Sequence, residues 1–239
     1  MFIDQTKCVG CGMCLKYCAL GAISLMDHKA VIDRDRCTEC GSCFRSNCCK
    51  MTAITPEALE WPRLARSIMS DVTVVYKGIG GRGTEEMKTN DVTGRYKDGY
   101  SGLVIELGRP SESSSLRDLE YMAKIVCRHG GRFEECNPIT NFMSNPETGE
   151  IKPELLDERV MSGIIEVTIP NESLVEIIQD VIEGAKHIDT VISLGVACKI
   201  AKDGRIPARD ILSSIGLEPR PEYKVNVGLG RPEYQNWEE

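Results

Sequence analysis

The sequence predicts an α+β protein made of two unlike parts, a cysteine-rich module over residues 1–57 and a larger domain over residues 103–230. Two observations predict this division. Nine of the twelve cysteines fall between positions 8 and 49, whereas strand-like and helix-like patterns alternate only from residue 103 onward. Residues 58–102 connect the two parts with a helix, a strand and a glycine-rich loop, and residues 231–239 form a charged tail.

The nine clustered cysteines form two motifs with metal-ligand spacing. In each motif, three cysteines separated by two residues are followed by a fourth further along the chain. Three such thiolates hold one cubane cluster, and the fourth reaches the neighbouring cluster. The spacing therefore predicts two [4Fe-4S] clusters. The expected ligands are Cys8, Cys11, Cys14 and Cys49 for one cluster and Cys18, Cys37, Cys40 and Cys43 for the other.

An internal repeat bears on the choice between the adjacent cysteines Cys48 and Cys49. The two motifs match at an offset of 29 residues up to their third cysteines, and Ala22 then matches Ala53 at an offset of 31. In this register Cys49 corresponds to Cys18, and Cys48 is the spare cysteine. A ligand that followed the third cysteine as closely as the chain allows would instead be Cys48.

Two other uses of clustered cysteines fit less well. Structural zinc sites with four thiolates usually join two CxxC pairs across a long gap, rather than two runs of three cysteines. Disulfides are typical of secreted chains, but the N-terminus lacks the basic and apolar regions of a signal peptide. Because exposed clusters are damaged by oxygen, we expect a reducing cytoplasm, that of an anaerobe.

At these cysteines the sequence resembles the bacterial-type two-cluster ferredoxins. The resemblance covers residues 1–57. It implies a 2[4Fe-4S] ferredoxin module, with two short hairpins and two short helices around the clusters, and low-potential one-electron transfer. The sequence departs from the family at Ala19 and Lys50, which follow the fourth cysteine of each motif where the family usually has proline.

Charge and hydropathy exclude two classes of partner. The net charge of −7 argues against nucleic acid as a partner. No stretch of about 18 apolar residues occurs, so the sequence predicts no membrane span.

The connecting residues 58–102 contain one suggestive motif. A helix is expected over residues 57–71 and a strand over residues 71–76, and Gly78 to Gly83 then match the dinucleotide pattern G-x-G-x-x-G. A dinucleotide loop should open a long helix, and none follows here. We therefore expect an extended loop over residues 78–102, which either docks a protein or cofactor or is a plain surface loop. Trp61 packs either over the cysteine-rich module or in a core.

From residue 103 the elements follow the order β-α-β-β-α-β, the split β-α-β arrangement. The expected strands cover residues 103–107, 132–142, 163–169 and 190–194, and helical stripes span residues 116–126 and 174–182. Ser114 or Ser115 is expected to cap the first helix, and Ser173 with Glu176 forms a candidate capping box for the second. A short helix over 207–214 and a strand over 223–227 follow.

The larger domain contains no recognisable catalytic set. Cys127, Cys136 and Cys198 are scattered and predict no third metal site, and neither a Ser/His/Asp set nor a Walker loop occurs. The catalytic residues, if the chain has any, are therefore unknown.

Three functions are consistent with these patterns. The first is an electron-transfer subunit that passes low-potential electrons to a larger redox enzyme, with the C-terminal domain docking this partner or forming an oligomer. The second is a small reductase that binds substrate or flavin in its C-terminal domain, and the third is a ligand-sensing regulatory module. The segment from Gly83 to Arg95 is similar to part of the anaerobic reductases of the 6-hydroxynicotinate reductase kind, which implies a reductase partner.

Overall fold

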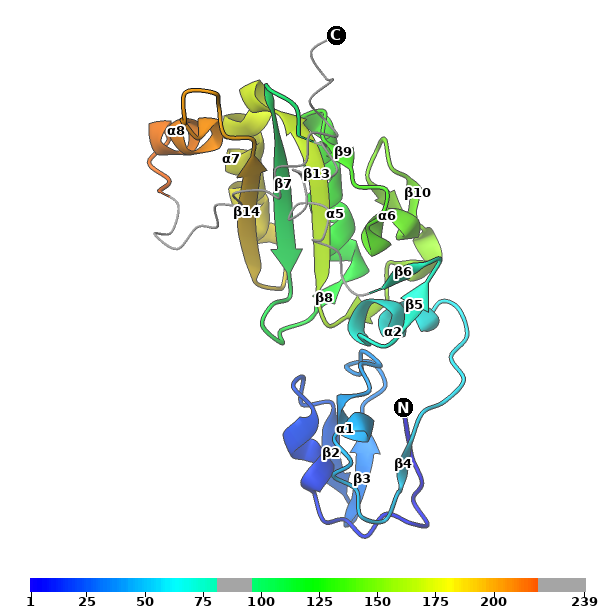
Figure 1. Ribbon diagram of the computed structural model, residues 1–239. Helices are drawn as coiled ribbons and strands as arrows, with labels where there is room; N and C mark the ends of the chain where they lie inside the picture. The colour runs from blue at the N-terminus through cyan, green and yellow to red at the C-terminus, as the bar shows by residue number, and fades with distance from the viewer. Residues whose placement is uncertain (81–95, 219–239) are drawn as a thin grey trace.

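The computed structural model describes residues 1–80 and 96–218. Figure 1 shows a small lobe formed by the N-terminal residues and a larger lobe of helices packed on a sheet. The mixture of helices and strands confirms the predicted α+β class. No helix in the described residues is long and apolar enough to cross a membrane.

The small lobe consists of two antiparallel strand pairs and two short helices. Strand β1 (Phe2–Ile3) pairs with β4 (Ile54–Thr55), and β2 (Ile23–Met26) pairs with β3 (Lys29–Ile32). The 3-10 helix η1 covers Met13–Tyr17, and helix α1 covers Ser42–Arg45.

The backbone of the small lobe repeats in the register that the sequence repeat predicts. The amide of Cys8 donates to Asp4 O at 2.9 Å, and the amide of Cys37 donates to Asp33 O at 3.0 Å. Gly12 precedes η1 with a φ of 72°, and its counterpart at position 41 precedes α1 with a φ of 70°. The two motifs therefore place their cysteines on equivalent backbone turns.

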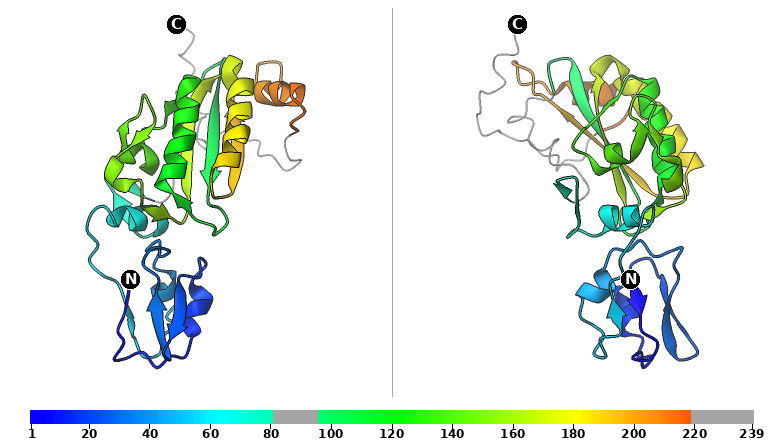
Figure 2. Two further views of the ribbon diagram at one scale, coloured as in Figure 1. Left: turned by 180° about the vertical axis from the view of Figure 1, so that it is seen from behind. Right: turned by 90° about the vertical axis from the view of Figure 1, so that its right-hand side faces the viewer.

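The larger lobe is built on a four-stranded antiparallel sheet in the order β14-β7-β13-β9. The strands are β7 (Tyr100–Leu107), β9 (Arg132–Phe133), β13 (Gly163–Pro170) and β14 (Ile192–Cys198). Helices α5 (Leu116–Arg128) and α7 (Leu174–Gly184) cover one face of the sheet (Figure 2). The four sheet strands and helices α5 and α7, taken without the shorter elements between them, follow one another as β-α-β-β-α-β. Each pair of strands joined by one of these helices is separated in the sheet by a strand of the other pair.

The core of the larger lobe follows from the alternation of side chains along its strands. Leu103, Ile105 and Leu107 of β7 are fully buried, because alternate residues of a strand face the same side. Leu119 of α5 and Ile177 of α7 bury their side chains in the same core.

Two expectations about this lobe were wrong. Residues 132–142 do not form one broken strand: after β9 the chain forms helix α6 (Pro138–Phe142), whose first amide, that of Ile139, is capped by the side chain of Asn137. The capping box at Ser173 is absent, because Ser173 already belongs to the 3-10 turn η3 (Asn171–Ser173) and its side chain makes no cap hydrogen bond. Of the two candidate caps for α5, Ser115 accepts from the amide of Asp118 at 3.0 Å.

The connecting segment is less regular than expected. Helix α2 covers only Leu64–Ser70, and the strand expected over residues 71–76 is reduced to β5 (Val75–Tyr76), which pairs with β6 (Ile79–Gly80). Most of the glycine-rich loop, the strand expected over 223–227 and the charged tail lie outside the described residues.

The remaining elements are β8 (Ser114–Ser115), β10 (Met143–Asn145), β11 (Glu150–Ile151), η2 (Pro153–Leu155), β12 (Arg159–Val160), η4 (Ala185–His187) and α8 (Pro207–Ser214).

Candidate metal centre

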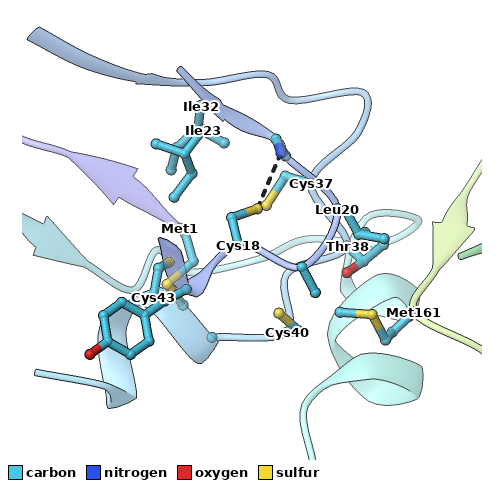
Figure 3. A pocket seen from close by; sticks show the side chains of 14 residues that line it. Met1, Cys18, Leu20, Ile23, Ile32, Cys37, Thr38, Cys40, Cys43 and Met161 are labelled. Atoms are coloured by element: carbon cyan, nitrogen blue, oxygen red, sulfur yellow. Dashed lines mark hydrogen bonds between the residues drawn. The ribbon is translucent and has the colours of Figure 1, made fainter. Parts of the chain in front are cut away.

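Cysteines from both motifs line one pocket between the lobes. Cys18 of the first motif lies there with the first three cysteines of the second motif (Figure 3). Ile23 and Ile32 contribute apolar walls from the small lobe, and Met161 lines the pocket from the larger lobe, between β12 and β13. The structure thus brings together one complete set of expected ligands, Cys18, Cys37, Cys40 and Cys43.

The pKa of the third cysteine in each motif is raised by a different set of neighbouring cysteines, so the thiols fall into two groups. Burial, together with negative charge on Cys48, Cys11 and Cys8, raises the pKa of Cys14 to about 11. Burial likewise raises the pKa of Cys43 to about 12, helped by charge on three neighbouring cysteines. The neighbours that act on Cys43 are Cys40, Cys37 and Cys18.

The raised pKa values mean that Cys14 and Cys43 carry little thiolate at neutral pH in the absence of a metal. Thiols that bind a metal are deprotonated outright. Four cysteines line the same pocket, although within residues 1–80 and 96–218 no three His, Cys, Asp or Glu side chains are placed to hold a single metal ion.

Backbone amides already point at three of the sulfurs. The amide of Ala22 donates to Cys18 Sγ at 3.2 Å, and that of Ala53 donates to Cys49 Sγ at 3.3 Å. A third amide, that of Ala30, donates to Cys8 Sγ at 3.3 Å. Amide hydrogen bonds to ligand sulfur are one way in which proteins tune iron–sulfur clusters.

Cys48 and Cys49 are distinguished by two features that point in opposite directions. The carbonyl of Cys49 accepts from Thr52 N at 3.0 Å, as the carbonyl of Cys18 accepts from Gly21 N at 3.0 Å, so Cys49 has the backbone setting of Cys18. The thiol that acts on Cys14 is nevertheless that of Cys48, which is 9% exposed. The backbone setting therefore favours Cys49 as the ligand, whereas the position of the thiol favours Cys48.

Other residues considered from the sequence lie away from the pocket. Trp61 stacks on Tyr76, contacts Phe142 edge-on and donates to Glu154 Oε1 at 3.2 Å, so it packs on the larger lobe rather than over the cysteines. Cys127 lies near the carbonyl of Pro146, with 3.7 Å between its sulfur and that oxygen.

Sequence reasoning missed the residues that join α2 to the second motif. Arg63 and Arg66 contact the loop that carries Cys37, and Glu39 is buried within that loop. Ion pairs between segments so far apart in sequence leave no local pattern. The one available signal was that Glu39 replaces Gly10 in the internal repeat.

Comparison with known proteins gives one finding. A family model described as a 4Fe-4S binding domain matches residues 1–24, which include Cys8, Cys11, Cys14 and Cys18. Neither the search of curated proteins nor that of solved structures gave a match. The match indicates [4Fe-4S] cluster binding and supports an iron–sulfur electron-transfer role for this segment.

Proposed function

We propose that this chain is an electron-transfer protein that holds two [4Fe-4S] clusters and passes low-potential electrons to a larger redox enzyme. The observation that carries the proposal is the position of Cys18 among the cysteines of the second motif. An exchange of fourth ligands between motifs is typical of two-cluster ferredoxins. The ligands would be Cys8, Cys11, Cys14 and Cys49 for one cluster and Cys18, Cys37, Cys40 and Cys43 for the other.

A [4Fe-4S] cluster accepts and releases one electron at a potential set by nearby charge, hydrogen bonds to sulfur and solvent exposure. The residues of this chain supply those conditions. Ile23 and Ile32 line the pocket with apolar side chains, the amide of Ala22 donates to Cys18 Sγ, and Met161 borders the pocket from the larger lobe.

The surface near Cys11 supports exchange of electrons with a separate protein. Cys11 is exposed, and Val9, two residues before it in the chain, is 62% exposed. Met13 and Leu25 are 40% and 46% exposed, and Leu25 lies close to Gly12 in the same motif. Exposed apolar side chains grouped at one site are typical of protein–protein contacts.

Metal and sulfide analysis of the anaerobically reconstituted chain tests the proposal. Two complete ligand sets predict about eight irons and about eight acid-labile sulfides per chain. A content near four irons would contradict the second cluster. Two zinc ions without the absorption of iron–sulfur charge transfer would contradict the proposal altogether, because zinc has no redox chemistry.

The partner is tested by purifying the native protein under anaerobic conditions and identifying what co-purifies. We expect a redox enzyme subunit. We also expect the isolated chain to reduce a dye with an artificial donor but to turn over no metabolite, because no acid–base or nucleophilic set was recognised in its sequence.

A further inference from the structure

The two cysteine motifs differ at one structurally demanding position. Gly10 and Glu39 occupy equivalent places between the first and second cysteines, and their φ angles are 69° and 56°. At position 10 only glycine fits, because a Cβ there would lie 2.0 Å from the carbonyl oxygen of His28. At position 39 a glutamate adopts the same left-handed conformation, which is uncommon for residues other than glycine.

The negatively charged carboxylate of Glu39 is also buried. The residue is 1% exposed, and its side chain is not exposed at all. Arg63 donates to Glu39 Oε1 through Nε at 2.8 Å and through Nη2 at 2.6 Å. Arg34 lies 3.8 Å from the same oxygen, and the α-ammonium of Met1 contacts the other oxygen. A buried carboxylate stays charged only when cationic or hydrogen-bonding partners surround it. The partners of Glu39 therefore stabilise a negative charge at this position of the loop.

Helix α2 is fixed to the same loop by a second arginine. Arg66 is 6% exposed, and its Nη1 donates to three carbonyls of the loop. These are the carbonyls of Arg34 at 3.1 Å, Asp35 at 2.9 Å and Cys37 at 2.9 Å. Its Nε pairs with Glu158, next to β12 of the larger lobe. Arg63 precedes α2 directly, so these contacts also hold Arg63 in place beside Glu39.

Both charges lie beside the ligands of the pocket. Glu39 stands between Cys37 and Cys40 in the chain, and Arg63 donates to its carboxylate. A negative charge disfavours an electron added nearby, and a positive charge favours it. The first motif has glycine in place of the glutamate, so it lacks this source of field.

We propose that the Glu39–Arg63 pair sets the reduction potential of the cluster held by Cys18, Cys37, Cys40 and Cys43, and makes it differ from that of the other cluster. This inference rests on the proposed two-cluster function. The negative charge of Glu39 opposes reduction of this cluster, and the positive charge of Arg63 favours it. Removing either charge should change the reduction potential of this cluster and leave that of the other cluster unchanged.

Anaerobic redox titration of the full chain, followed by EPR, tests this inference. Glu39→Gln keeps the shape of the side chain and should shift one potential upward, whereas Arg63→Gln should shift the same potential downward. Arg63→Lys retains the charge and should restore most of the parent potential. The double variant Glu39→Gln/Arg63→Gln should return close to the parent value, because both charges are removed together.

The matched control is Arg117→Gln. Arg117 pairs with Asp157 at 2.6 Å, but both side chains are well exposed, at 62% and 90%, and the pair lies outside the cysteine loops. Its loss should leave both potentials unchanged.

The outcomes separate this inference from the function on which it rests. A parent chain with fewer than two clusters would contradict the proposed function and this inference with it. Two clusters whose potentials stay fixed in both single variants would contradict the inference alone. Equal shifts of both clusters, or a double variant further from the parent than either single variant, would show a purely structural role and overturn it. If Arg63→Gln loses iron, the Glu39→Gln variant alone tests the inference. An upward shift of one reduction potential would support it, and a downward shift would overturn it.

Discussion

Cys48 and Cys49 are adjacent, yet only Cys49 has the hydrogen-bonded setting of Cys18. We expect Cys49→Ser to lose the cluster that we propose it holds with Cys8, Cys11 and Cys14, because a serine hydroxyl replaces a thiolate ligand. Cys48→Ser should retain both proposed clusters, because Cys48 is the spare cysteine in the register of the internal repeat. Iron analysis and EPR of the two reduced variants measure the difference.

The opposite pattern, with iron lost only from Cys48→Ser, would show that the inserted residues of the second motif lie after the ligand. It would also show that the proximity of the Cys48 thiol to Cys14 outweighs the backbone register.

At the same scale, the sequence revealed the cysteines but not their charged neighbours. Ligand spacing is local chemistry, so the candidates Cys8 to Cys49 could be read directly from the chain. Glu39 and Arg63 are 24 residues apart and meet only after both segments have folded. Neither spacing nor periodicity carries that information.

At the scale of elements, α2 belongs to one lobe and binds the other. Its residues Ala65, Ile68 and Met69 lie in the core of the larger lobe, while Arg66 binds the loop of the second motif. Arg66→Met would leave Glu158 and three carbonyls without this partner. Breaking a buried pair of this kind costs about 3–5 kcal/mol.

We therefore expect Arg66→Met to increase hydrogen exchange in residues 34–38 and to expose the connecting segment to proteases, while Arg66→Lys has a smaller effect. Arg117→Gln, which removes an exposed pair, serves as the control. Unchanged exchange in Arg66→Met would show that the lobes are held together by other contacts.

Helix α5 allows a prediction confined to the larger lobe. Leu119 is fully buried and packs over Gly163 of β13, where an added Cβ would lie 2.5 Å from Leu119 Cδ1. Leu119→Ala should reduce the free energy of unfolding of this lobe by about 2–5 kcal/mol, the usual cost of such a cavity. Urea denaturation followed by circular dichroism measures it, and the exposed Ile182→Ala on α7 is the control. Loss of iron from Leu119→Ala at low urea would show that the small lobe unfolds together with the larger one.

The elements that the sequence predicted well are those with a long regular pattern. The strand expected over 163–169 is observed as Gly163–Pro170, and the helix expected over 207–214 has those bounds. Helix α6 was mistaken for a strand because it spans only Pro138–Phe142, too short for helical periodicity to appear. Its signals were the capping Asn137 and the proline that follows it.

At the scale of the whole molecule, the lobes differ in how much core they have. Among the described residues, the small lobe buries a core that consists largely of Ile, Ala and three cysteines, whereas the larger lobe buries a far bigger apolar cluster. Small domains with little core usually need a metal or disulfides to fold. Metal binding contributes folding free energy directly in such domains.

We therefore expect removal of iron by a chelator and mild oxidant to unfold the small lobe selectively. Hydrogen exchange should become fast in β2 and β3 while β7 and β13 stay protected. Reconstitution with iron and sulfide should restore protection, which controls for irreversible damage. Equal loss of protection in both lobes would show that they fold as one unit.

The relative placement of the lobes could not be predicted from the sequence. The residues that join them, among them Met161 in the pocket and Arg66 on α2, belong to no motif. Met161 follows a short strand, and Arg66 lies in a short helix in which residues 65–69 are all buried. Only the three-dimensional structure reveals that both face the second motif.

The contacts of Arg66 have a consequence for how this protein can vary between species. Its three acceptors in the small lobe are main-chain carbonyls, which every amino acid possesses. Substitutions at positions 34 and 35 therefore leave this joint intact, whereas insertion or deletion of a single residue there would displace the carbonyls. Natural selection on this stretch should conserve its length more strictly than its composition.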